Sequence, residues 1–220
     1  MPAESNYLMV QVITYPRLTG AVLAVALGMM LGVIIGASLQ SILIAALFLP
    51  LLIFVGALAP RVLTAFSGQG VRRVDFYQWK FGITLWSAAY AILFFARFPT
   101  SVVGGLATAT LLGLYIAGKW GCYRSGCCGS MPYRVVNATT SLPVTEIRIS
   151  GGLLVIVCMC IVLDRSSSAV LIGLTGHVTT RALGYWGRGE RINFAGLMAM
   201  PDIPALLTII VIQALCQPHV

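Results

Sequence analysis

Long apolar runs separated by short polar or charged segments dominate the chain. A membrane-spanning helix needs about 20 mostly apolar residues, because unpaired backbone polar groups are too costly in lipid for other open structures. Seven runs qualify, at 19–39, 41–59, 79–98, 101–118, 150–164, 168–186 and 202–216. The fifth and seventh runs are short, so we expect these helices to begin deeper in the flanking loops. The pattern predicts an all-α integral membrane protein with about seven transmembrane helices.

Local features refine the first two spans. Gln40 leaves so little room between them that they form either an immediate hairpin or one broken element. Gly28, Gly32 and Gly36 recur at four-residue spacing, a pattern that lets helices approach closely in membranes. Pro50 is expected to kink the second span because proline lacks a backbone N–H.

The apolar pattern is not interrupted by a soluble domain, a linker or an internal repeat. Residues 1–220 are therefore predicted to form a single polytopic transmembrane domain. The longest extramembrane stretch, 119–149, is too short for a core of its own. We expect it to form a small interfacial cap between helices four and five.

Composition supports lipid as the solvent for most of the exterior. Of the 220 residues, 59% are hydrophobic and 9% are charged, whereas soluble domains average about a quarter charged residues. A net charge of +8 would also suit a protein that binds nucleic acid. The cations lie between apolar spans rather than on one amphipathic face, so we expect no nucleic-acid partner.

The cations are distributed very unevenly between the two sides of the predicted bundle. If seven spans alternate from the N-terminus, twelve cations fall on the N-terminal side, called side A. These are Arg17, Arg61, Arg72, Arg73, Lys80, Lys119, Arg124, Arg134, Arg148, Arg181, Arg188 and Arg191, against Arg97 and Arg165 opposite. Two interpretations remain open and are compatible. One is positive-inside topology, with side A cytoplasmic; the other is an anion-binding site, because arginine suits phosphate geometry.

Three side chains on or near the sixth span, and one on the fourth, are candidate functional groups. Arg181 lies deep in the sixth run, and Arg188 follows it two helical turns later. Ions inside a span cost about 2.5–3.5 kcal/mol on insertion scales, so they are functional candidates, with snorkelling to the interface as the alternative. Lys119 ends the fourth run. His177, one turn before Arg181, is either an acid–base group or a helix-packing residue.

Three thiols gather next to Lys119. Cys122, Cys127 and Cys128 lie among glycines and cations in residues 118–129, and nearby cations favour the thiolate. A structural disulfide from Cys122 to Cys127 or Cys128 and direct chemistry both remain open. Structural zinc normally takes four ligands, so we expect no metal at these three thiols.

Residues 118–129 resemble the signature of the prolipoprotein diacylglyceryl transferase family. In its cysteine-rich version the signature reads Gly-Arg-x-Gly-Cys-x-x-x-Gly-Cys-Cys-x-Gly; here Lys119 replaces the arginine and Gly129 arrives one residue early. Neighbouring features keep the family's order over roughly residues 78–216. Lys80 stands where the family has the histidine of a His-Gly-Gly motif, and Pro143 stands in a proline-led motif before the fifth span. Arg181 and Arg188 reproduce a pair of arginines at the end of the sixth span.

The resemblance implies a seven-span fold and an enzyme of the bacterial plasma membrane with its active face outside the cytoplasm. The family transfers the diacylglyceryl group of phosphatidylglycerol to a lipoprotein cysteine without a cofactor. The implied partners are thus the bilayer, a phosphatidylglycerol-like lipid and a lipoprotein or peptide acceptor. The implied phosphate ligands are Lys119, Arg181, Arg188 and Arg124. The other implied catalytic candidates are Lys80, His177 as a base, Cys122, Cys127 and Cys128.

The departures from the family pattern change what we expect of the reaction. Lys119 loses the bidentate geometry of arginine, and Cys127 stands in place of the signature glutamate. We therefore expect a different acceptor, a different lipid or lost activity. A non-catalytic lipid-binding or scaffold protein and a membrane thiol-redox protein remain open. Positive-inside topology would reverse the orientation that the family implies; we adopt the family orientation.

Overall fold

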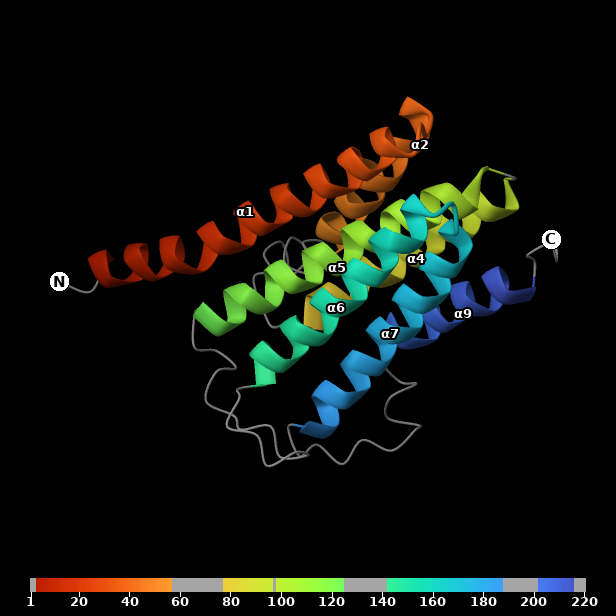
Figure 1. Cartoon of the computed structure of the whole chain (residues 1–220). Coiled ribbons are helices and arrows are strands. Elements are labelled where there is room, and N and C mark those ends of the chain that lie inside the picture. Colours follow the sequence, from red (N-terminus) through yellow and green to blue (C-terminus); the bar gives the residue numbers. More distant parts are fainter. Residues whose placement is uncertain (1–2, 57–76, 97, 125–141, 188–201, 216–220) are drawn as a thin grey trace, which may run out of the picture.

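The computed structural model describes residues 3–56, 77–96, 98–124, 142–187 and 202–215, and in these ranges all regular structure is helical (Figure 1). The elements are α1 (Ala3–Ile34), α2 (Leu39–Leu43), the π-helical turn η1 (Ile44–Phe48), α4 (Tyr77–Phe95), α5 (Thr100–Arg124), α6 (Leu142–Val162), α7 (Ser166–Gly187) and α9 (Asp202–Leu215). The segment of α2 and η1 continues as helix to Gly56. The predicted all-α class is confirmed for this part of the chain, and each of the seven apolar runs falls on a helical segment.

Three of the described helical segments are long and apolar enough to cross a membrane. They are Leu39–Gly56, Thr100–Arg124 and Pro143–Val162. Shorter apolar helical stretches occupy Leu18–Ile34, Gly82–Phe95 and Ile203–Ala214. Large apolar side chains stand exposed on outward helix faces, among them Leu23, Leu51 and Val155. The crossing of a membrane by all seven segments stays a prediction.

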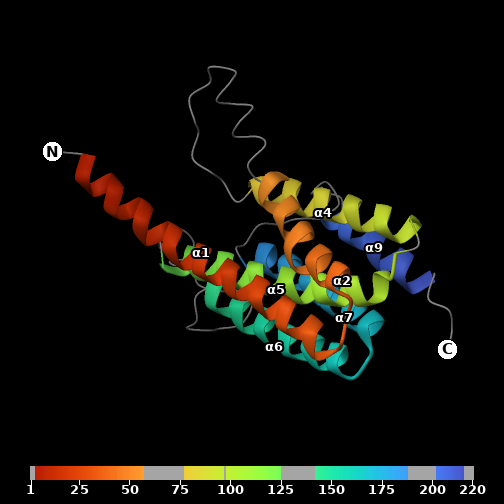
Figure 2. The same ribbon diagram turned by 90° about the horizontal axis from the view of Figure 1, so that it is seen from above.

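Consecutive helices run antiparallel, and α5 lies at the centre of the bundle (Figure 1). Most side chains of α5 are buried, and this helix contacts α1, η1, α4, α6 and α7. Figure 2 shows the N-terminal part of α1 projecting beyond the other helices. The beginnings of α1 and α6 and the ends of α5 and α7 lie at the same end of the bundle, which corresponds to side A.

Helix α1 begins at Ala3, well before the apolar run that starts at residue 19, and two further helices also extend beyond their runs. Helix α5 continues past residue 118 to Arg124, and α6 begins at Leu142 rather than near residue 150. Both ends of the expected 119–149 cap are therefore helical, and its middle, 125–141, lies outside the described residues. The physical reason is that Lys119 and Glu146 in these turns pair with each other inside the bundle. The polar residues at these two helix ends therefore belong to packed helices and not to a loop.

A tight hairpin joins α1 to α2, which decides between the two alternatives at Gln40. Gly36 adopts a left-handed φ of 66°, and its neighbours close two backbone hydrogen bonds, Gly36 N–H to Val33 O and Ala37 N–H to Gly32 O. This pattern is a Schellman helix ending. The Ser38 hydroxyl then accepts the N–H of Ser41 and caps α2.

The second segment contains an irregular turn where proline was expected to disturb it. The π-helical turn Ile44–Phe48 ends two residues before Pro50. Proline cannot donate to the helix and its ring crowds the carbonyl of Ala46, four residues earlier, so a wider turn relieves the clash. The chain remains helical through this point.

Small residues allow α1 to pack closely on α5. A Cβ on Gly28 would collide with Thr110, and a Cβ on Gly113 would lie 2.8 Å from the Ala24 Cβ. Gly32 likewise leaves no room for a side chain beside Ile42. The predicted close packing is thus confirmed for Gly28 and Gly32, whereas Gly36 serves the turn and has no neighbour within 4 Å of a Cβ.

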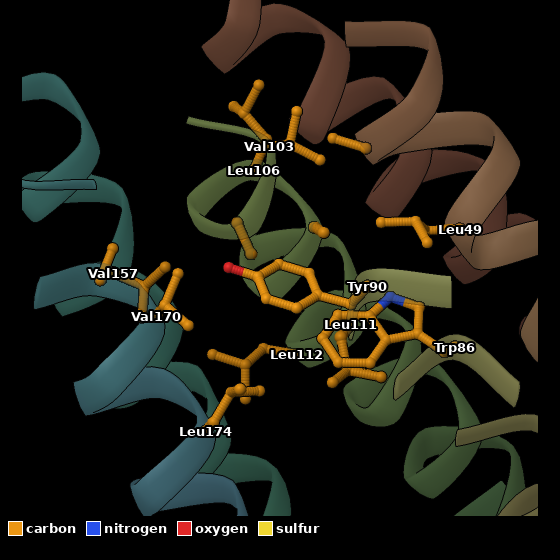
Figure 3. Close-up of a cluster of buried hydrophobic side chains, with 14 of the residues drawn as sticks. Leu49, Trp86, Tyr90, Val103, Leu106, Leu111, Leu112, Val157, Val170 and Leu174 are labelled. Carbon is orange, nitrogen blue, oxygen red and sulfur yellow. The ribbon is translucent and has the colours of Figure 1, made fainter. Parts of the chain in front are cut away.

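The hydrophobic core is centred on α4, α5 and α7, and side chains from the other described helices, such as Leu49 and Val157, complete it (Figure 3). Trp86 and Tyr90 on α4 stack with ring centroids 5.8 Å apart and face Leu111 and Leu112 on α5. The Tyr90 hydroxyl donates to Gln213 Oε1 at 3.0 Å, which ties α4 to α9 within the core. Apolar packing and this hydrogen bond hold the framework on which the polar site is placed.

Candidate functional site

Four ionisable side chains from three helices are buried together toward side A. Lys119 lies near the end of α5, Glu146 near the start of α6, and His177 and Arg181 one turn apart on α7. Each of these residues is at most 4% exposed. Burying charged groups is unfavourable unless they are paired, so the stability of this cluster depends on interactions among its members.

Lys119 and Glu146 form an ion pair through Nζ and Oε2. The pair joins α5 to α6, with both side chains 4% exposed. In a low-dielectric interior each ion would cost several kcal/mol by itself, and mutual attraction offsets that cost when the geometry is good. Glu146 therefore neutralises the lysine that the sequence suggested as a phosphate ligand.

Tyr115 completes the environment of this pair. Its hydroxyl donates to Glu146 Oε1 at 3.2 Å, and Lys119 Nζ lies 5.3 Å from the centroid of its ring. The aromatic face attracts the ammonium group, and the hydroxyl satisfies the second carboxylate oxygen. Gly184 on α7 packs against the same carboxylate, where a Cβ would collide with Oε1. Three helices thus fix the position of Glu146.

His177 is fully buried beside the pair. Its ring meets the Tyr115 ring edge to face, with centroids 4.7 Å apart and an interplanar angle of 89°. Among the described residues, neither imidazole nitrogen meets a hydrogen-bond partner. Buried polar atoms are normally satisfied, so His177 retains one donor and one acceptor for another group.

Arg181 brings the remaining charge to this cluster. It follows His177 by four residues, which places both on one face of α7, and it is 2% exposed. The charges of Arg181 and Lys119 both act on His177. Within the described residues, the cluster thus brings two cations, Lys119 and Arg181, near one carboxylate, Glu146.

The structure brings together some of the predicted site residues and separates others. Lys119, His177 and Arg181 lie in one cluster, and buried Cys122 follows Lys119 on the same face of α5. Arg124 is exposed at the end of α5 and does not belong to the buried cluster. Lys80 lies in the first turn of α4, but its side chain is outside the described residues. Cys127, Cys128 and Arg188 also lie outside them.

Sequence reasoning missed Glu146, Tyr115 and Gly184 as parts of the site. The sequence does contain a signal for Glu146. The chain has only six acidic residues, and this one lies next to an apolar run with few charges. Acids at such positions usually pair with a buried cation. Tyr115 and Gly184 give no comparable signal, since both residue types are common in apolar helices.

A metal site does not emerge from the described residues, where no three His, Cys, Asp or Glu side chains gather around a common point. The chemistry that the cluster offers is that of proton transfer and anion binding. A carboxylate, an imidazole, a phenol and two cations lie buried together in the bundle.

Comparisons of the chain with protein-family models, with curated proteins and with solved structures give no match. The resemblance of residues 118–129 to the diacylglyceryl transferase signature therefore stays a prediction.

Proposed function

We propose that the chain is an integral membrane transferase that binds the anionic head group of a phospholipid and passes a diacylglyceryl-like group to a nucleophile. The observation that carries the proposal is the burial of Lys119, His177 and Arg181 in one cluster toward one end of an apolar bundle. Three apolar helices long enough to cross a membrane support lipid as the surrounding solvent. The plasma membrane of a bacterium, with side A outside the cytoplasm, is the location that the family resemblance favours.

Arg181 is the group best suited to hold the phosphate. Its guanidinium can bind two phosphate oxygens at once, and it lies buried one turn from His177 on the same face of α7. Lys119 would then act with Glu146 as an ion pair beside the reacting centre. This assignment moves the main phosphate contact from the signature lysine to α7.

The proposed reaction conserves atoms and charge. A thiol of the acceptor gives its proton to an imidazole nitrogen of His177, and the thiolate sulfur attacks the glycerol carbon of the lipid. A carbon–sulfur bond forms as the carbon–oxygen bond to the phosphate breaks. Glycerol phosphate departs with the electron pair, stabilised by Arg181, and takes up the proton from His177, which restores the base. His177 suits the base because its nitrogens have no partner among the described residues.

The test uses purified full-length protein in phosphatidylglycerol vesicles with a lipoprotein-type peptide that contains one cysteine. Mass spectrometry follows the addition of a diacylglyceryl group to the peptide. We expect turnover by the wild type, loss of turnover in Arg181→Lys, and retention in Arg165→Lys, which alters an exposed cation in the turn at the opposite end. Full activity of Arg181→Lys would overturn the assignment of the phosphate contact.

A non-catalytic lipid-binding protein is the second candidate, and the Lys119–Glu146 pair favours it. A cation that is already neutralised contributes less to a leaving phosphate than an uncompensated one. In the same assay, tight retention of phosphatidylglycerol without peptide modification would support this second function. The thiol-redox alternative depends on Cys127 and Cys128, which lie outside the described residues, and stays a prediction.

A further inference from the structure

An apolar groove runs along the outer side of the bundle, between α1, α5 and α6. It has a volume of about 260 Å³ and is lined by small and aliphatic residues with one aromatic ring. The lining includes Leu23 and Leu27 on α1, Gly113, Ile116 and Trp120 on α5, and Leu154 on α6. The exposed side chains of Leu23 and Trp120 show that the groove is open to the outside.

The groove and the buried polar cluster use different faces of α5. Gly113, Ala117 and Trp120 follow the spacing of one helix face, on which the groove lies. Tyr115 and Lys119 belong to another face, which meets α6 and α7. The groove is therefore separate from the site proposed for catalysis.

The same face of α5 ends in an exposed cation. Arg124 comes four residues after Trp120 in the last helical turn, so it continues the row of groove residues toward side A. Trp120 and Tyr123 lie beside it, both about half exposed, with ring centroids 5.8 Å apart. Exposed aromatic rings next to a cation at a helix end are typical of the head-group level of a membrane.

We propose that this groove binds one acyl chain of an anionic phospholipid, whose head group contacts Arg124. The volume decides the size of the occupant, because pockets for complete drug-sized ligands span about 300–1,000 Å³ and this groove is smaller. An apolar segment of one acyl chain suits this lining, and the phosphate supplies the charge that complements Arg124. The inference rests on the membrane embedding proposed above and not on the transferase activity.

The experiment reconstitutes the full chain in vesicles that contain phosphatidylglycerol with a diazirine in the middle of one acyl chain. After illumination, cross-linked peptides are mapped by mass spectrometry. We expect labels on Leu23, Leu27 or Ile116, and loss of these labels when the groove is filled by Ile116→Phe or by Leu23→Phe at its exposed rim. Ile156→Phe, at a half-exposed position of α6 outside the groove, is the matched control and should keep them.

Two variants test the proposed contact between the lipid head group and Arg124. Arg124→Gln should lower labelling by about two- to fivefold, the effect expected for one exposed charge contact. Arg148→Gln removes a cation that is also exposed toward side A, on α6, and should change labelling little. Excess inorganic phosphate should not displace the label if the acyl chain holds the lipid.

Several outcomes would overturn the inference. Equal labelling from diazirine phosphatidylcholine would remove the role of Arg124. A dimer that cross-links through the groove and excludes lipid would assign the groove to a second copy of the chain. Unchanged labels in both filled variants, with helicity intact by circular dichroism, would place the lipid elsewhere. Failure to enter vesicles would instead refute the membrane embedding.

Discussion

Glu146 on α6 reaches Lys119 on α5 inside the bundle and pairs with it beneath the ring of Tyr115. The pair explains how a lysine next to an apolar run can be almost fully buried. It also means that neither residue can be altered alone without leaving the other charged and uncompensated. The first test of the site follows from this dependence.

Lys119→Met is expected to destabilise the protein by about 3–5 kcal/mol, because Glu146 would remain as an unpaired buried charge. Lys119→Met combined with Glu146→Leu should recover most of that loss, since apolar replacements of a buried pair are often neutral. The measurement is denaturant unfolding in detergent micelles followed by circular dichroism. Arg124→Met, at an exposed position of the same helix, is the control. Additive losses in the double variant would contradict a direct pair.

Gly184→Ala is expected to disturb the same carboxylate from the α7 side. The new Cβ collides with Glu146 Oε1, which Tyr115 and Lys119 hold in place. Overpacking of this kind costs about 1–3 kcal/mol, which exceeds the gain of up to about 1 kcal/mol from helix propensity.

Gly151→Ala on α6 gives the matched control, because nothing lies within 4 Å of its added Cβ. It should be neutral or slightly stabilising in the same unfolding assay. Equal stability of Gly184→Ala and Gly151→Ala would show that Glu146 is not confined as described.

The helical framework could be predicted from the sequence because its signal is local. Each long apolar run falls on a helix, and the shortness of the fifth run correctly indicated a helix that begins earlier, at Leu142. The predicted cap at 119–149 is wrong at both ends, where the structure has helix, because the cause is an interaction between residues far apart in the sequence. Lys119 and Glu146 look like loop residues one at a time, and their pairing across helices makes them buried helical residues.

The cations of the site could be predicted from the sequence, but their counter-ion, Glu146, could not. Lys119 and Arg181 stand out as charges beside or within apolar runs, and the structure places both near His177. The partner of a buried charge depends on which helices adjoin, which the pattern along one chain does not specify. The glycine row shows the same limit, because Gly36 continues the spacing of Gly28 and Gly32 but forms a turn.

His177→Phe separates a catalytic role from a packing role. Phenylalanine keeps an aromatic ring against Tyr115 and removes two buried nitrogens that lack partners among the described residues. Stability in micelles should stay equal or rise, because the cost of buried unsatisfied polar groups disappears. Transfer to the cysteine peptide should be lost if His177 is the base. Retained turnover with raised stability would assign His177 to packing alone.

Gly28→Leu should loosen α1 from α5 without unfolding the other helices. Thr110, which a side chain at residue 28 would strike, cannot move freely because its hydroxyl donates to Leu106 O at 2.9 Å. Overpacking costs about 1–3 kcal/mol, and α1 can relieve it by moving outward. Hydrogen exchange should therefore accelerate in residues 18–34, while the amides of α5 to α7 keep their protection. Val33→Leu, at an exposed position of the same helix, should leave exchange unchanged. Uniform acceleration across the bundle would mean that α1 is an inseparable part of the core.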